Sequence, residues 1–220
     1  MKHVVGIWGS CALLAMACAE GAKHNDHPEA GRLYDPDAGS GASMVILDGE
    51  VAESSFSAKT AISGEVPFYT FGNVYVGAMH TEIYISSEVT TCDDGMISGH
   101  TIFLDMFQNV SIKNGIASNE ADIRLSKPGT YDIVSPSLLE KESFSGKDLA
   151  VALATKPNSM GRDGQFADHG TLTITSIDDD YVEGMFELRF GSSTDDSESY
   201  LSGSFVAPRC DTWLRSGNGP

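Results

Sequence analysis

Alternation of apolar and polar residues with a period of two is the feature of this sequence that most restricts its fold. The segment from Gly170 to Ile177 places Leu172 and Ile174 on one face, with hydroxyl-bearing residues at intervals around them. An acidic turn follows, and the chain then alternates again through Val182, Gly184, Phe186, Leu188 and Phe190. Successive side chains of a strand point to opposite faces, so this pattern predicts an antiparallel hairpin.

The same pattern recurs from Met44 onward. Runs of β-branched and aromatic residues, separated by turn-forming residues, are typical of strands. Ile102, Leu104 and Met106 share one face of such a run, and Leu149–Ala154 is short enough to favour strand over buried helix. Ser137–Glu142 is the best helical candidate. Residues 44–220 therefore predict one all-β domain, a single antiparallel β-sandwich or barrel of about nine to eleven strands.

The N-terminus is typical of an exported protein. Residues 1–17 combine a short basic start with an uncharged apolar run, which is shorter than the roughly 20 residues needed to span a bilayer. We interpret them as a signal peptide. Residues 18–43 are polar and predict a flexible linker. Within that linker, His24 and His27 could bind a transition metal weakly, although such tracts usually bind nothing specific.

The segment Leu14–Cys18 resembles a lipobox, in which small residues precede a cysteine that becomes lipidated. Its leucine lies one residue further from Cys18 than the family pattern prefers. The alternative is cleavage at the A-x-A-like site Ala17–Ala19, which would give a secreted soluble protein. We expect lipidation, including palmitate, at Cys18. Ala19 after the cysteine would direct a Gram-negative lipoprotein to the outer membrane.

The remaining cysteines predict a disulfide. Cys11 leaves with the signal peptide and Cys18 carries the lipid, so Cys92 and Cys210 remain as a pair in an oxidising compartment. Their bond would close a long loop and stabilise the fold by roughly 4–5 kcal/mol in the chain-entropy model. Neither residue belongs to a C-x-x-C motif or has a histidine at ligand spacing, which argues against a metal site there.

The net charge of −17 limits the partners of the chain. Such a surface repels phosphate backbones and anionic lipid headgroups, so we expect no nucleic-acid binding. Calcium is the cation that suits many exposed carboxylates. The weak candidates are Asp178, Asp179, Asp180, Asp195 and Asp196. None has the spacing of a calcium loop, so solvated turns are the simpler interpretation, and we expect no other metal or cofactor.

The C-terminal half resembles a known class of proteins. Pro128–Tyr131, the hydroxyl-rich run after Gly170, and the paired elements Val182–Phe186 and Leu201–Phe205 with a v-x-G-x-F pattern are similar to the tail of bacterial β-rich envelope lipoproteins of unknown function. The resemblance implies a β architecture and an envelope location. It brings no catalytic residues.

Catalytic motifs are weak throughout the sequence. No G-x-S-x-G element is present. The domain's histidines, His80, His100 and His169, lie near predicted strand ends, and any of them could pair with a carboxylate such as Asp105 or Asp168. A glycosidase would need two carboxylates at a set separation, which sequence alone does not supply.

These observations favour a non-enzymatic lipoprotein of the cell envelope, a binding or structural module attached to the membrane by its lipid and facing the periplasm or the cell surface. Its protein or glycan partner is not identified by any motif. Two alternatives stay open. A wide apolar barrel interior would indicate a carrier of small apolar ligands. A cleft that holds a histidine and an acid would indicate an extracytoplasmic hydrolase acting on glycan or lipid.

Overall fold

The computed structural model describes residues 44–51, 54–67, 69–89, 91–92, 99–117, 123–155, 164–191 and 199–210. The expected signal peptide, Cys18 and the linker lie outside the described residues, as do Asp195 and Asp196. The described chain is mostly β-strand with one short helix, which confirms the predicted fold class. Its helix is too short to cross a bilayer, and no other described segment forms a membrane-spanning helix.

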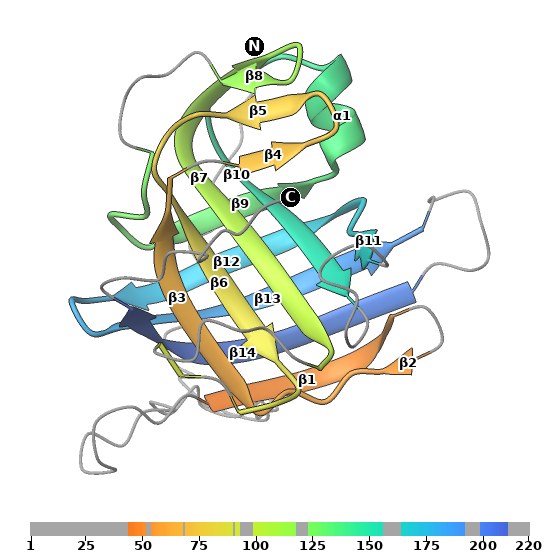
Figure 1. Cartoon of the computed structure of the whole chain (residues 1–220), viewed down its shortest axis with the longest axis vertical. Coiled ribbons are helices and arrows are strands. Elements are labelled where there is room, and N and C mark those ends of the chain that lie inside the picture. Colours follow the sequence, from red (N-terminus) through yellow and green to blue (C-terminus); the bar gives the residue numbers. More distant parts are fainter. Residues whose placement is uncertain are drawn as a thin grey trace, which may run out of the picture. The chain divides into compact units, whose positions relative to one another are not determined.

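Eight strands close into a barrel (Figure 1). In chain order they are β3 (Thr60–Val66), β6 (His80–Ser86), β7 (Thr101–Lys113), β9 (Gly129–Val134), β10 (Phe144–Thr155), β12 (His169–Ile177), β13 (Tyr181–Phe190) and β14 (Ser199–Cys210). Around the barrel the order is β10–β9–β12–β13–β14–β3–β6–β7, and β7 pairs with β10 to close the ring. The β9–β10 and β14–β3 pairs are parallel, and the other neighbours are antiparallel.

Shorter elements lie outside this ring. They are β1 (Met44–Val51), β2 (Ser54–Ser55), β4 (Tyr69–Phe71), β5 (Val74–Val76), β8 (Ile116–Ala117), β11 (Gly164–Phe166) and the helix α1 (Pro136–Lys141). Strand β1 runs along β14, while β4, β5 and β8 form a small sheet that continues from β7. Of the nine strands with six or more residues, eight correspond to strands that the sequence pattern predicts, whereas β3 was not predicted. The helical candidate near Ser137 is α1.

Side chains fill the interior of the barrel. All eight strands contribute buried residues to one cluster, and along most strands these occupy alternate positions. The predicted face of Ile102, Leu104 and Met106 is part of this cluster. Its largest fully buried members include Tyr131, Phe186, Phe190 and Phe205. Of the two predicted architectures, the domain therefore has the barrel, with its main core in the lumen.

The paired v-x-G-x-F elements explain part of this packing. Gly184 on β13 lies opposite Phe205 on β14, and Phe186 lies opposite Gly203. A Cβ atom on Gly184 would lie 2.8 Å from the Phe205 ring, and one on Gly203 would lie 2.9 Å from the Phe186 ring. Each glycine thus leaves room for the aromatic ring of the neighbouring strand. The motif specifies how the lumen packs.

Two tight turns set the register of hairpins. Between β7 and β8, Asn114 and Gly115 both have positive φ angles, of 51° and 77°, which is the combination that a two-residue hairpin loop prefers. Between β12 and β13, the carboxylate of Asp178 accepts hydrogen bonds from the backbone N–H groups of Asp180 and Tyr181, at 2.8 and 2.7 Å. This closes the acidic turn that the sequence predicts.

The two sides of the barrel have different outer faces. Figure 1 shows that the strands of one side cross those of the other. On β3, β6, β7 and β10, here called the buried wall, the outward residues are also mostly covered. Tyr84 and Phe103 pack there with Cys92 and Cys210, which form a disulfide with Cα atoms 5.4 Å apart, as the cysteine pattern predicts. On β9, β12, β13 and β14, here called the open wall, most outward residues are half-buried or exposed.

Candidate functional site

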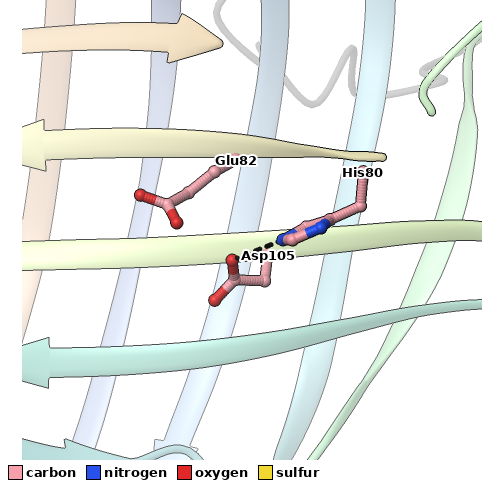
Figure 2. A group of neighbouring side chains, drawn as sticks. All are labelled: His80, Glu82 and Asp105. Carbon is pink, nitrogen blue, oxygen red and sulfur yellow. Dashed lines mark hydrogen bonds and ion pairs between the residues drawn. The ribbon is translucent and has the colours of Figure 1, made fainter. Parts of the chain in front are cut away.

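The buried wall carries a compact group of polar side chains on its outer face. His80 and Glu82 lie two residues apart on β6, so their side chains share one face of the strand. Asp105 on β7 is the direct cross-strand partner of Glu82. Figure 2 shows the three side chains on the same side of β6 and β7, facing away from the strands of the open wall. We call this group the His80 cluster.

The geometry of the His80 cluster is tight. The imidazole Nε2 of His80 lies 3.0 Å from Oδ1 of Asp105, and Nδ1 lies 3.4 Å from the carbonyl oxygen of Ala78. One ligand atom from each of His80, Glu82 and Asp105 lies within 4.8 Å of the other two. Among the described residues this is the one grouping of three such ligands.

The His80 cluster is enclosed by the protein. His80 and Glu82 are 0% exposed and Asp105 is 4% exposed. Two aromatic rings flank the imidazole: the ring of Phe107 at 5.0 Å and that of Tyr69 at 6.3 Å between centroids. Two carboxylates directly opposite one another repel, and burial increases the cost of their charges. Favourable interactions therefore have to offset this repulsion, and the contact of Asp105 with His80 is one of them.

Among the described residues, Asp105 pairs with His80 and not with His100 or His169. His100 contacts the ring of Phe56, at 5.5 Å between centroids, and His169 is exposed on the open wall. Asp168 instead accepts a hydrogen bond from the backbone N–H of Gly191 at 2.8 Å. Both members of the His80–Asp105 pair were thus among the candidates predicted from the sequence. Glu82 was missed, although the alternation of His80 and Glu82 on one strand was a usable signal.

The predicted calcium ligands that the structure describes lie on a turn. Asp178, Asp179 and Asp180 are exposed, and one carboxylate oxygen of Asp178 is already bonded to two backbone N–H groups. They do not form a group of three metal ligands within the described part of the chain. Specific calcium binding at these residues stays a prediction.

A polar pocket lies where β3 and β14 end, and we call it the mouth pocket. Its volume is about 380 Å³, and its lining residues are Glu65, Arg124, Leu125, Ser126 and Arg209. Nη2 of Arg209 lies 3.3 Å from a carboxylate oxygen of Glu65, which also accepts a hydrogen bond from the Thr81 hydroxyl. Nothing in the sequence pattern brings these residues together.

Two buried tyrosines, Tyr84 and Tyr131, have phenol groups whose pKa is shifted by their surroundings. Burial raises the pKa of the Tyr84 phenol above its ordinary value, and burial does the same for Tyr131 in the lumen. The hydroxyl of Tyr131 has no hydrogen-bond partner among the described residues. Both tyrosines are therefore neutral, enclosed side chains with a structural role.

Comparison of the chain with protein-family models, with curated proteins and with solved structures gives no match.

Proposed function

We propose that this chain is a non-enzymatic lipoprotein of the cell envelope that acts as a binding module. The apolar run before Cys18 and the polar linker after it support export and attachment through a lipid. The Cys92–Cys210 disulfide supports an oxidising compartment, because such bonds form and persist outside the cytoplasm. In a Gram-negative cell, this anchor places the barrel on the outer membrane.

The burial of the His80 cluster supports a non-enzymatic role. A general acid or base has to lie within hydrogen-bond reach of its substrate. The imidazole of His80 is fully enclosed, and the carboxylates of Glu82 and Asp105 are covered with it. A substrate would have to displace the residues that cover this cluster before any of the three groups acted on it.

The filled lumen favours a binding site at the surface over the interior of the barrel. An eight-stranded barrel is just wide enough to be filled by side chains or to hold one small ligand. Here Phe186, Phe190, Phe205 and Tyr131 are fully buried in that space. This packing removes the main support for the alternative of a carrier for small apolar molecules.

The mouth pocket is the observation that carries the binding proposal. Its volume of about 380 Å³ lies within the range of small-molecule sites, and charged side chains of both signs line it. Guanidinium groups bind carboxylate and phosphate oxygens in a fixed planar geometry. Arg124 and Arg209 therefore favour a ligand group that carries a carboxylate or a phosphate.

The location is tested by mass spectrometry of the N-terminus after expression of the full chain in a Gram-negative host. The proposal predicts a mature chain that begins at a lipidated Cys18. A Cys18→Ser variant should lose the lipid and leave the membrane fraction. An unmodified mature chain that begins at Glu20 would instead establish a secreted protein.

Binding at the mouth pocket is tested by NMR titration of the isotope-labelled protein with citrate and with inorganic phosphate. We expect saturable shifts of the backbone amides near Ser126 and Arg209. These shifts should be lost in Arg124→Gln and Arg209→Gln. Arg189→Gln is the matched control, because Arg189 lies on the open wall against the ring of Tyr200. Equal titrations of all three variants would reject the pocket as the site.

A further inference from the structure

We propose that His80, Glu82 and Asp105 bind one zinc ion as a buried structural site. This inference goes beyond the binding role proposed above, since it concerns an ion held under the surface of the barrel. It is carried by the geometry of the His80 cluster, by its charge and by the contact of the second imidazole nitrogen.

The positions of the ligands suit a single ion. Zinc binds imidazole nitrogen and carboxylate oxygen at about 2.0–2.2 Å, so its ligands in a tetrahedral site lie roughly 3.4 Å apart. The Nε2–Oδ1 distance between His80 and Asp105 is 3.0 Å, and all three ligand atoms lie within 4.8 Å of one another. Small rotations of the Glu82 and Asp105 side chains would bring the three atoms to the distances that zinc requires.

The charges of the cluster favour a divalent cation. Charged groups at 0–4% exposure are costly unless they are paired or coordinate a metal. A divalent cation beside these two buried carboxylates would therefore be favourable.

The second nitrogen of the imidazole provides an independent observation. Nδ1 of His80 lies 3.4 Å from the carbonyl oxygen of Ala78, a position from which an Nδ1–H group donates to it. The 3.0 Å contact between Nε2 and Asp105 requires a proton between the two groups, and zinc would replace that proton. The contact with Ala78 would then hold the remaining proton on Nδ1. Histidines that bind metals usually donate their other ring N–H to a carbonyl or carboxylate in this way.

The donor set and the surroundings define the class of ion and its role. One imidazole and two carboxylates supply three of the four ligands of a tetrahedral zinc site, and a second carboxylate oxygen or an enclosed water molecule would supply the fourth. Calcium instead requires six to eight oxygen ligands. The rings of Tyr69 and Phe107 lie against His80, and the cluster is closed to solvent. The ion would therefore link β6 to β7 and stabilise the buried wall.

The test uses the mature chain with Cys18→Ser, His24→Gln and His27→Gln, which removes other zinc ligands from the linker. After refolding with excess zinc and gel filtration, we expect one zinc ion per chain by elemental analysis. Zinc should raise the melting temperature relative to the EDTA-treated protein by about 5 °C or more. Refolding with Co²⁺ should give the visible absorption bands of a tetrahedral nitrogen–oxygen site.

Matched variants separate this site from the acidic surface. Glu82→Gln and His80→Gln should lose the retained zinc and the cobalt bands. Glu187→Gln removes an exposed outer carboxylate of the open wall and should retain both. If the variants of the cluster fail to fold, the protein with an intact cluster still decides the question. Failure of that protein to retain zinc, with an unchanged melting temperature, overturns the proposal, as does equal retention by Glu82→Gln.

Discussion

The buried wall and the open wall have similar inner faces and different outer faces. Every residue of β6 is buried, whereas β13 alternates between buried residues and residues that are half-buried or exposed. The outward positions of β6 include His80 and Glu82, and those of β13 include Glu187 and Arg189. A charged residue at an outward position is thus solvated on one wall and enclosed on the other. Only the enclosed residues need specific partners, so they mark the candidate site.

Removal of the disulfide should have the largest effect on stability. The Cys92–Cys210 bond lies among the outer residues of the buried wall and spans 118 residues of sequence. We expect the Cys92→Ser/Cys210→Ser double variant to lose about 4 kcal/mol in urea unfolding, because the unfolded chain regains the entropy of a long loop. Wild-type protein unfolded in urea under reducing conditions should show a similar loss of stability. A loss below about 1 kcal/mol would show that this bond does not stabilise the buried wall.

Carboxylates on the two outer faces should respond differently to truncation. Asp105→Ala leaves the buried Nε2 of His80 without its carboxylate partner, and we expect a loss of about 3 kcal/mol. Asp132→Ala on the open wall is the matched control, since this carboxylate is exposed, and its effect should stay within about 0.5 kcal/mol. Both values come from urea unfolding at neutral pH. Equal effects would remove the distinction between the walls.

Overpacking of the lumen tests the feature that both walls share. Gly184→Ala places a methyl group 2.7 Å from the Thr173 carbonyl oxygen and 2.8 Å from the Phe205 ring. We expect a loss of about 2 kcal/mol in urea unfolding. At Gly129 the nearest atom to an added Cβ is 4.0 Å away, so Gly129→Ala serves as the control with little effect. A tolerated Gly184→Ala would contradict the tight pairing of glycine and phenylalanine.

Stability above pH 10 tests the burial of Tyr84 and Tyr131. Burial raises the pKa of each phenol above the ordinary value of 10.0. The unfolded chain then ionises first, so the stability that is fully present below about pH 10 is lost as the pH rises above it. We expect Tyr84→Phe and Tyr131→Phe each to reduce this loss by about 1 kcal/mol at pH 11. Variants that unfold with the pH dependence of wild type would argue against this burial.

The sequence predicted the strands best where one face is solvated. The alternation through β12 and β13 gives both the hairpin and the lumen-facing residues such as Phe186 and Leu188. It did not predict that β9 and β10, or β14 and β3, pair in parallel, because such contacts depend on how distant segments meet. It also left the choice between sandwich and barrel open, since the β7–β10 pairing that closes the ring has no local signal.

The candidate site was predicted only in part for the same reason. His80 and Asp105 were among the residues considered, but period two assigns them to an outward face without saying whether that face is covered. The partnership with Glu82 follows from the cross-strand register, in which Glu82 lies opposite Asp105. The mouth pocket joins β3, β14 and residues 124–126, which are far apart in the sequence.

Chemical modification of histidine tests the enclosure of the His80 cluster most directly. His80 lies on the buried wall at 0% exposure, and His169 lies exposed on the open wall. Diethylpyrocarbonate treatment of the native protein, followed by peptide mass spectrometry, should modify His169 rapidly and leave His80 unmodified until the protein is denatured. Modification of His80 in the native protein at a rate similar to that of His169 would show that the His80 cluster is not enclosed.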